Sequence, residues 1–533
     1  MTHSPSPQPR VDIIGITSIP SPKGKEKSIA SSSRVFAGEA ARTCYSRHGL
    51  YYPKDYLDPK HRKITDAVIG ATRQAGHLTT RQHFFITFGI SNVSRQFIWS
   101  FLHNHPFYNS EQVSQRYVPV KKNFFYFPSL PSRASSLYQQ TSEEQIEAYQ
   151  KLKKLLIPTA AEEYFYLFPQ QKNTPEGTAA VEKKAQEIAR YVLGVNTFAY
   201  LYHTISALTL IRYYRAIHLN QFSEETKTVV KAMINAVKKI DPNFSKELDK
   251  EPFPKEKTTP NQLFSSPINF SQAKKYKENF DRRLKKKSVR LIDYSKNGPA
   301  TLAAAVRGIL GLTARELPLS QAVSLALNPE KNPLLGEVLN LTTLDPISRS
   351  LSLISYTFLK KLSHTADSQD QRHRLVPAAR PLLTYQYAGE PDFIIPLLIK
   401  KNSRALKLYQ QTMEKIFTNI NKIIKMGVEP EKALYLLPNA FPIRFTETGS
   451  LLALHHKYRM RLCYNAQREI WQASLEEVKQ IKKVHPQIGR FLLPPCRMRF
   501  LSGQTPFCPE GNHFCGHPIW LKKRIEDFPS RLI

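Results

Sequence analysis

A short polar stretch in the first half of the chain combines hydroxyl, amide and carboxylate side chains with one arginine. The segment NSEQVSQRY runs from residue 109 to residue 117. An arginine can bind a phosphate through two parallel N–H bonds, and serine hydroxyls or backbone N–H groups supply further donors. The stretch therefore suits a phosphate together with sugar hydroxyls, although a polar turn that closes a helix would have the same composition. The candidate ligand-binding residues are Glu111, Gln112, Ser114, Gln115 and Arg116.

The end of the chain is rich in cysteine and histidine. Cys496, Cys508, Cys515, His513 and His517 lie within a short span. Such side chains can bind zinc tetrahedrally, but the spacing from Cys508 to Cys515 is wider than that of tight zinc-ligand pairs. A cap of reduced thiols folded over the core is the alternative. The sequence leaves both open, and we assign no metal ligand.

The polar stretch follows a predicted strand and a predicted helix. HFFITFGI predicts the strand, and the apolar residues of SNVSRQFIWSFLH recur at helical spacing. In the second half, LDPISRSLSLISYTFLKKL predicts a helix that Asp345 caps and that has Pro346 at its first position. The apolar face of that predicted helix consists of Ile347, Leu351, Ile354, Phe358 and Leu362.

The two halves of the chain repeat the same order of motifs at similar offsets. A long internal duplication explains such an order better than chance, and pairing of the two copies within one molecule follows as a hypothesis. The matching motifs are Ser94-Arg95 with Ser348-Arg349, Gln115-Arg116 with Gln371-Arg372, and Thr204 with Thr448.

Shifts in composition divide the chain into five parts. Residues 1–35 are rich in Ser, Pro and Lys and are expected to form a flexible basic arm. A second stretch of distinct composition, residues 246–290, is charged and contains prolines, which indicates a linker. The predicted parts are the arm 1–35, a first domain 36–245, the linker 246–290, a second domain 291–490 and a Cys/His-containing tail 491–533.

Two segments resemble the flavin-dependent thymidylate synthases. Residues 76–118 have the family's order of a Gly-His…His pair, a strand, a Ser-Arg helix, a His-containing signature and Ser-x-Arg-Tyr, and residues 445–471 resemble its C-terminal helices. The resemblance implies an α/β (α+β) fold made of two tandem thymidylate-synthase-complementing-type domains. Each domain would have a mixed or antiparallel sheet packed with long helices.

The resemblance also assigns roles to two arginines. Arg461 stands where the family has the arginine that meets the uracil ring, and a fixed cation there stabilises charge that develops on the ring. Arg190 stands where the family has an arginine for the dUMP phosphate. The first copy has Ile217 in the place of Arg461, and the second has Leu434 in the place of Arg190. Each copy thus holds part of one nucleotide site, and we predict composite sites with Arg461 as the catalytic residue.

The residues expected to contact the flavin depart from the family's pattern. The family's Arg-His-Arg signature is replaced in the first half by His103-Asn104-His105. An Arg372-His373-Arg374 triplet occurs in the second half, but the alignment on Gln-Arg sets Arg372 beside Arg116, so we do not assign it as the displaced motif. The predicted cofactor-binding residues are Thr79, His103, Asn104, His105 and His456.

The resemblance implies the reductive methylation of dUMP to dTMP, with FAD as cofactor and methylenetetrahydrofolate and NADPH as co-substrates. This chemistry needs no protein nucleophile, and Cys463 is the only cysteine near the proposed site. A homodimer would mimic the family's tetramer. Two alternatives stay open: a catalytically degenerate protein that binds a nucleotide or flavin, and a basic protein that binds nucleic acid.

The bulk composition limits these alternatives. The formal net charge is +34, from 77 Lys+Arg against 43 Asp+Glu, which favours anionic partners such as nucleotides and folates. No recognisable nucleic-acid motif accompanies the basic runs, so nucleic-acid binding is not the expected function. No apolar run is long enough for a membrane span or a signal peptide, and five scattered cysteines do not form a disulfide framework, so we expect a cytoplasmic protein.

Overall fold

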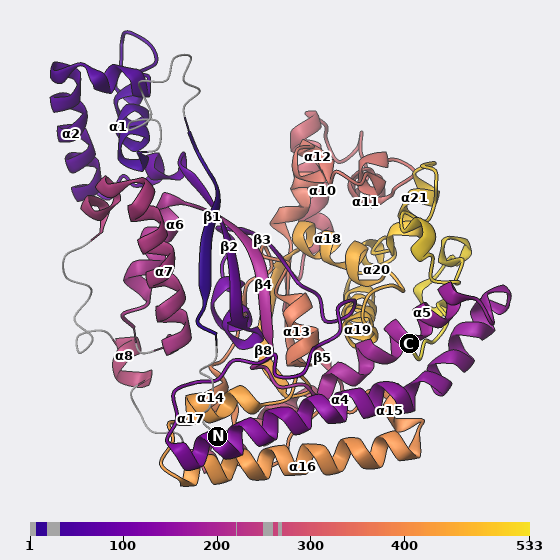
Figure 1. The fold of residues 1–533 in the computed structure, drawn as a ribbon. Helices are drawn as coiled ribbons and strands as arrows, with labels where there is room; N and C mark the ends of the chain where they lie inside the picture. The colour runs from indigo at the N-terminus through magenta and orange to yellow at the C-terminus, as the bar shows by residue number, and fades with distance from the viewer. Residues whose placement is uncertain (1–6, 19–31, 220, 249–258, 265–268) are drawn as a thin grey trace. The chain divides into compact units, whose positions relative to one another are not determined.

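The computed structural model describes residues 7–18, 32–219, 221–248, 259–264 and 269–533, and these form two compact units (Figure 1). The first unit holds the described residues of 1–114, 124–128 and 196–267. The second holds those of 115–123, 129–195 and 268–533. A long segment from the first half of the sequence, residues 129–195, therefore folds as part of the second unit.

The first unit contains a four-stranded antiparallel sheet with the order β1-β2-β4-β3. Strand β1 lies within the range predicted as a flexible arm, so that prediction is wrong for residues 10–16: their side chains alternate between more and less exposed positions, and their backbone pairs with β2. Residues 1–6 and 19–31 of the predicted arm lie outside the described residues. The strands are β1 (Arg10–Ile16), β2 (Phe85–Ser94), β3 (Asn109–Gln112) and β4 (Phe198–Ser206).

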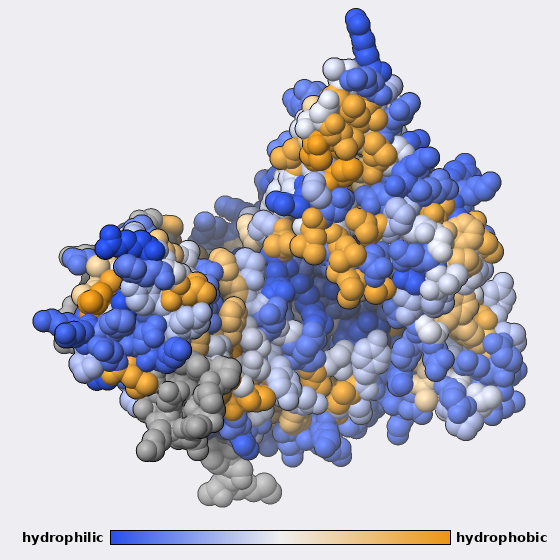
Figure 2. All heavy atoms as spheres, turned by 90° about the horizontal axis from the view of Figure 1, so that it is seen from above, coloured by the Kyte–Doolittle hydropathy of each residue, from blue (hydrophilic) through white to orange (hydrophobic). Residues whose placement is uncertain are grey.

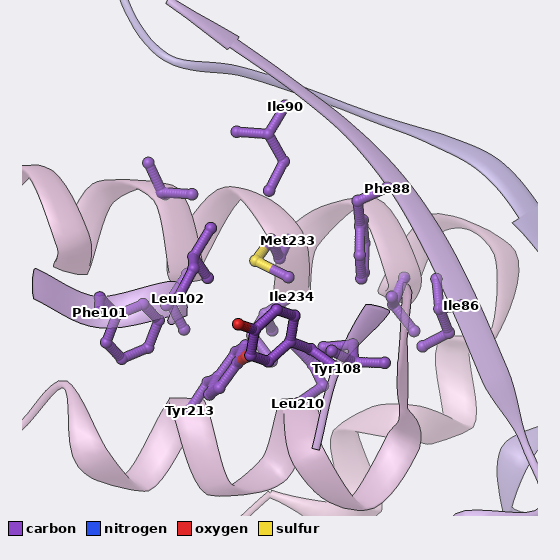
Figure 3. Close-up of a cluster of buried hydrophobic side chains, with 14 of the residues drawn as sticks. Ile86, Phe88, Ile90, Phe101, Leu102, Tyr108, Leu210, Tyr213, Met233 and Ile234 are labelled. Atoms are coloured by element: carbon purple, nitrogen blue, oxygen red, sulfur yellow. The ribbon is translucent and has the colours of Figure 1, made fainter. Parts of the chain in front are cut away.

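The core of the first unit lies between β2 and two helices (Figure 3). Ile86, Phe88 and Ile90 are every second residue of β2, and all three are buried. They pack with Leu210 and Met233, which come from the two helices. Burial of side chains of this size stabilises a fold by about 1.5–3 kcal/mol each. The helices of this unit are α1 (Ser33–Cys44), α2 (Pro59–Gln74), α3 (Arg95–Phe97), α6 (Ala207–Ala216), α7 (Glu224–Ile240) and α8 (Thr259–Phe264).

The second unit repeats this sheet. Its antiparallel strands have the order β5-β6-β8-β7, which is the order of the first sheet at the corresponding positions. The predicted fold class, a sheet packed with helices in a tandem arrangement, is confirmed, and the antiparallel alternative is the one that occurs. The strands are β5 (Val289–Tyr294), β6 (Ser355–Ser363), β7 (Ala378–Ala379) and β8 (Pro442–Ser450).

A pair of long helices crosses the second unit. α4 (Ser132–Leu167) comes from the first half of the sequence and runs alongside α16 (Ser403–Lys425) from the second (Figure 1). Asn419 donates a hydrogen bond of 3.0 Å to Thr141 between them. The other helices of this unit are α5 (Pro175–Ala189), α9 (Phe270–Leu284), α10 (Gly298–Leu310), α11 (Leu319–Leu327), α12 (Pro346–Arg349), α13 (His364–Asp370), α14 (Leu383–Gln386), α15 (Leu397–Lys400), α17 (Pro430–Ala433), α18 (Leu451–Arg461), α19 (Arg468–Val484), α20 (Pro486–Gly489) and α21 (Pro495–Leu501).

The two sheets identify the residues that correspond in the two copies. The hydroxyl groups of Thr87 and Thr204 are hydrogen-bonded across 2.9 Å in the first sheet, and those of Thr357 and Thr448 across 2.9 Å in the second. The predicted match of Thr204 with Thr448 is therefore confirmed by identical cross-strand contacts.

The match of Ser94 with Ser348 is wrong. Ser94 ends β2, and its backbone N–H and hydroxyl both donate to Glu225. Ser363 ends β6 and donates to Glu469 in the same way. Ser348 instead lies in α12, ahead of β6. Ser363 is thus the counterpart of Ser94.

The match of Gln115 with Gln371 is also wrong. Gln115 follows β3, whereas Gln371 precedes β7, the corresponding strand of the second sheet. The corrected register sets the Arg372-His373-Arg374 triplet opposite His103-Asn104-His105, because both triplets lie between the serine-capped turn and the edge strand. The second copy therefore keeps the Arg-His-Arg signature.

The helix predicted over 344–362 forms only in part. Asp345 caps α12 as expected and accepts a hydrogen bond of 2.7 Å from the Ser348 N–H. From Ser355 onward the chain is strand β6, because pairing with β8 outweighs the helical spacing of its apolar residues. In the first half, the strand likewise continues to Ser94, and only residues 95–102 are helical.

The range predicted as a linker, 246–290, contains regular structure. α9 lies within it, and Phe280 and Leu284 of that helix are buried against Leu359 of β6. An apolar stripe that packs on the sheet therefore explains why this basic segment is helical. Residues 249–258 and 265–268 lie outside the described residues.

The surface carries apolar patches as well as the excess positive charge. Figure 2 shows hydrophobic side chains gathered in patches on one face, divided by hydrophilic surface. In the second unit Val338, Leu339, Leu344 and Leu353 are each at least 60% exposed. None of the helices in the described part of the chain combines the length and apolar character that crossing a membrane requires.

Candidate functional site

Arg116 lies in the second unit, just after the edge strand of the first sheet. Its Nε pairs with the carboxylate of Glu187, and its Nη2 donates a hydrogen bond of 2.5 Å to the backbone oxygen of Asn465. Burial disfavours ionisation of Glu187, but the charge of Arg116, assisted by Lys184 and Arg190, lowers the pKa of Glu187 to about 2. The guanidinium of Arg116 is therefore held between an ionised carboxylate and a carbonyl.

Arg190 is positioned by the end of α5. It begins a short 3₁₀ turn there, and its side chain is buried. Nη2 donates a hydrogen bond of 2.6 Å to Oε1 of Gln467, while Nε has no hydrogen-bond partner among the described residues. Gln467 is fully buried and in turn donates to the Tyr191 hydroxyl. The partner of a first-half arginine is thus a second-half glutamine.

Arg461 is the last residue of α18. Its Nε donates a hydrogen bond of 2.9 Å to Nε2 of His373, and its Nη2 donates one of 2.7 Å to the Gln369 carbonyl. Burial lowers the pKa of Arg461 to about 10, and the positive charges of Arg372 and Arg116 add to the effect. Arg116 is therefore near enough to Arg461 to repel it.

The three arginines converge on one segment of the chain, residues 461–467, which joins α18 to α19. Arg461 begins this segment, Arg116 binds the backbone of Asn465, and Arg190 binds the side chain of Gln467. Gln369 also hydrogen-bonds to Gln467 and so connects the Arg190 and Arg461 contacts. The structure thus brings together Arg116, Arg190 and Arg461, which lie in three distant parts of the sequence.

His456 is close to the Arg-His-Arg triplet of the second copy. Its ring centroid lies 6.1 Å from that of His373, and its Nδ1 is buried with no hydrogen-bond partner among the described residues. The predicted cofactor-side residue His456 therefore sits beside His373, a residue that our sequence alignment set aside. The Arg-His-Arg triplet is visible in the sequence, but the alignment on Gln-Arg placed it opposite the wrong residues of the first copy.

The other predicted site residues occupy two places. His103 bonds the Tyr108 hydroxyl at 2.9 Å and His105 bonds the Tyr213 hydroxyl at 2.8 Å, so both histidines are held by the aromatic core of the first unit. Gln115 belongs to the second unit, where its side-chain oxygen accepts from Asn439. The remaining predicted site residues all lie in the first unit: Thr79, Asn104, Glu111, Gln112 and Ser114.

A cavity of about 670 Å³ opens beside Arg116 and Glu187 in the second unit. Helices α4 and α5 form one side of it, and the tail forms another. Tyr464 and Asn465 from the segment 461–467 also line it. The volume is in the range of pockets that take a nucleotide-sized or drug-sized ligand.

Five fully buried charges lie close to Arg461. The ammonium of Lys360 is 2.7 Å from Glu477, and that of Lys457 is 3.1 Å from Asp370. Glu447 pairs with both lysines. Arg461 and Arg380 add positive charge beside Asp370. Burial, with the nearby Asp370 charge, raises the pKa of Glu447 to about 7, against the opposing effect of the lysines.

The cysteines of the tail are free thiols. Cys496, Cys508 and Cys515 line one small cavity together with Cys463 and His517. Within the described ranges, no group of three or more potential ligands has an arrangement that would hold a metal ion.

Comparison with known proteins places the chain in a family. The model of the thymidylate synthase complementing protein family matches residues 30–243 and again residues 290–487. Because these two matches together cover more than half of the sequence, the chain belongs to the thymidylate synthase complementing protein family. The two matched ranges are consistent with a tandem arrangement.

The individual relatives are distant. A flavin-dependent thymidylate synthase from Sulfurisphaera tokodaii is 31% identical over 146 residues, which are 26% of this chain and 55% of that protein. One from Clostridium tetani is 28% identical over 253 residues, covering 44% of this chain and 95% of that protein. The chain spans about half the length of the first of these relatives. A crystal structure of the UMP/dUMP methylase PolB from Streptomyces cacaoi, bound with 5-Br dUMP, has 20% identity and a TM-score of 0.29, and covers 45% of this chain and 93% of that one.

Proposed function

We propose that this chain is a flavin-dependent thymidylate synthase that methylates dUMP to dTMP, with FAD as cofactor and methylenetetrahydrofolate and NADPH as co-substrates. The observation that carries the proposal is the convergence of Arg116 and Arg190, from the first copy, with Arg461, from the second. Each copy lacks at least one of the arginines, and the two copies together supply all three to a composite site.

Arg116 and Arg190 are suited to the phosphate of dUMP. Arg116 lines the cavity and Arg190 is buried within electrostatic range of it, and guanidinium groups bind phosphates through paired N–H bonds. Glu187 holds Arg116 in place in the absence of nucleotide. A phosphate would compete with that carboxylate for the same N–H groups.

Arg461 is suited to the pyrimidine. Its guanidinium is fixed by His373 and by the Gln369 carbonyl, so it does not have to reorganise when charge develops on the ring. A cation held at the ring carbonyl and N3 makes C5 more nucleophilic by stabilising the charge displaced from it. The role of this residue is therefore electrostatic and requires no proton transfer from the guanidinium.

FAD fits the residues of the second copy. The buried Nδ1 of His456 has no hydrogen-bond partner among the described residues, and His373, which lies between Arg372 and Arg374 in the sequence, is beside it. These four residues would hold the flavin. When bound, the flavin supplies the hydride that reduces the transferred carbon, while the protein supplies orientation and electrostatics.

The thiols do not favour the alternative thymidylate synthase chemistry, which depends on an activated cysteine. Burial raises the pKa of Cys463 to about 12, so this thiol stays protonated at neutral pH. It therefore lacks the thiolate that attack on a pyrimidine needs.

Several finer features belong to the same proposal. We expect two family-like domains that extend the predicted ranges 36–245 and 291–490 by β1 and by α9 with the start of β5, together with a cytoplasmic location and a homodimer in solution. The exposed apolar residues Val338, Leu339 and Leu344 support a self-association surface, because large exposed apolar groups commonly mark interfaces.

The deciding experiment incubates the purified full chain with dUMP, methylenetetrahydrofolate and NADPH, and follows dTMP by chromatography. We expect a flavin absorption spectrum and dTMP formation that stops when any one component is omitted. A protein that binds flavin or dUMP but forms no dTMP would be a degenerate binding protein. Duplex DNA binding that falls steeply with salt and is unchanged in Arg116→Ala, without dTMP formation, would point to the nucleic-acid alternative.

A further inference from the structure

The tail contributes a buried arginine to the cavity beside Arg116. The second family match ends at residue 487, and Arg531 lies well beyond it. Arg531 lines the cavity but is only 5% exposed. The residue therefore reaches the candidate site from a segment to which the family match assigns no part.

The position of Arg531 is fixed from several sides. Its guanidinium carbon lies 5.6 Å from the ring centre of Tyr464 and 5.5 Å from that of Trp471, and its backbone oxygen accepts a hydrogen bond from Arg468. Nε donates to the main-chain oxygen of Ile533 over 2.9 Å. Nη1 and Nη2 are buried and have no hydrogen-bond partner among the described residues.

Arg531 is one of several cations that interact with Glu187. Glu187 interacts electrostatically with Arg116, Lys184, Arg190 and Arg531, and Arg190 interacts with Glu469 as well. Burial, to which the charge of Arg531 adds, lowers the pKa of Lys184 to about 8. No hydrogen bond or ion pair of the Lys184 ammonium occurs among the residues that the structure describes.

The side chains that line the cavity as a whole carry four cations and four carboxylates. Glu510 accepts a hydrogen bond of 3.1 Å from Asn465, and Glu163 lies near His517. Glu176 also lines the cavity, at the start of α5. Because Nη1 and Nη2 of Arg531 are buried with no hydrogen-bond acceptor among the described residues, their burial is costly, and an oxyanion of a bound ligand would supply that acceptor.

We propose that Arg531 and Lys184 bind an oxyanion of a ligand, a phosphate or a carboxylate, at the tail side of this cavity. The two outer nitrogens of Arg531 present the parallel N–H groups that such an oxyanion accepts, and the Lys184 ammonium adds a point charge. The identity of the ligand rests on the proposed function: the oxyanion is either the phosphate of dUMP or the glutamate carboxylate of the folate.

The test measures the binding of inorganic phosphate, dUMP and tetrahydrofolate to the full chain by titration calorimetry. We expect Arg531→Gln and Lys184→Gln each to weaken at least one of these ligands by about tenfold or more. Arg524→Gln is the matched control, because Arg524 lies in the same tail but is exposed and paired with Asp527. Loss of affinity for phosphate and dUMP identifies a phosphate site, and loss for tetrahydrofolate alone identifies a carboxylate site.

Affinities within twofold of the unmodified chain for all three ligands in both variants would overturn the proposal, as would the failure of the unmodified chain to bind any of them. If Arg531→Gln does not fold, Lys184→Gln decides, since Lys184 is only partly buried on the surface of α5. A parallel dTMP assay separates the two ideas. Phosphate binding that depends on Arg531, without dTMP formation, would support the oxyanion site and refute the proposed thymidylate synthase activity. Formation of dTMP with unchanged affinities in both variants would support the activity and refute the oxyanion site.

Discussion

Nη2 of Arg190 donates a hydrogen bond of 2.6 Å to Oε1 of Gln467, although the two residues lie in different copies of the duplicated sequence. Gln467 has no exposed surface, so the contact also fixes the segment that follows Arg461. One hydrogen bond therefore connects the proposed phosphate end of the site with its pyrimidine end.

Arg190→Leu is expected to raise the KM for dUMP by roughly 10- to 100-fold, because a hydrogen bond to a charged group contributes about 1.5–3 kcal/mol. Leucine is a suitable replacement, since Leu434 begins the corresponding turn of the second copy. Steady-state kinetics measure the effect. Arg404→Leu on the exposed surface of α16 is the control, and an unchanged KM for dUMP in Arg190→Leu would remove Arg190 from the site.

Arg461→Ala should lower kcat by roughly 10²- to 10³-fold, with a smaller effect on dUMP affinity. A preorganised cation that stabilises developing charge acts mainly in the transition state, and loss of one such group costs about this much. Single-turnover dTMP formation and calorimetric dUMP binding separate the two effects. Met460→Ala, at an exposed position of the same helix, should retain full activity. A kcat near that of the unmodified chain in Arg461→Ala would contradict the electrostatic role.

The corrected register predicts that FAD contacts the Arg-His-Arg triplet of the second copy and not the matching triplet of the first. Arg374→Gln should weaken FAD binding by about tenfold, since it removes a charged donor beside His373. Asn104→Ala, at the matching triplet of the first copy, should bind FAD normally because Asn104 is exposed and bonds the Ser100 carbonyl. FAD retained after gel filtration reports both. The opposite pattern would restore our original assignment to His103-Asn104-His105.

The pH dependence of stability should reveal Glu447. Burial raises the pKa of Glu447 in the folded chain to about 7, above the ordinary glutamate value of 4.5. The folded chain therefore keeps a proton that the unfolded chain loses, so this contribution to stability is complete below pH 4.5 and is lost as the pH rises to about 7. Urea unfolding on either side of this window should differ by up to roughly 3 kcal/mol. In Glu447→Gln the difference should shrink, and an equally large difference there would assign it to another group.

Thiol labelling should follow exposure. Cys44 is exposed, whereas burial raises the pKa of Cys463 and Cys496 to about 12. Iodoacetamide reacts with thiolates, so the native chain should be alkylated first at Cys44, as mass spectrometry of peptides would show. Rapid labelling of Cys463 would instead indicate an activated thiol and would favour cysteine-based chemistry.

Local sequence patterns were misleading where tertiary pairing competed with them. Residues 355–362 have apolar side chains at helical spacing, yet they form β6 because β8 satisfies their backbone hydrogen bonds along the whole strand. The error in the repeat alignment has the same origin. Two Ser-Arg pairs matched by letter, while the cap contacts to Glu225 and Glu469 show that Ser94 corresponds to Ser363.

Residue types and motif order alone were enough to predict the duplicated organisation, the kind of fold and the arginines that are candidates for a nucleotide site. Those features depend on residue types and their order, which are visible along the chain. The strand order, the register of the two copies and the placement of Arg531 beside Lys184 and Glu187 became visible in the folded chain alone. The physical reason is that these features arise from contacts between residues hundreds of positions apart, such as Arg190 with Gln467, and no local pattern encodes which distant partner will satisfy a buried charge.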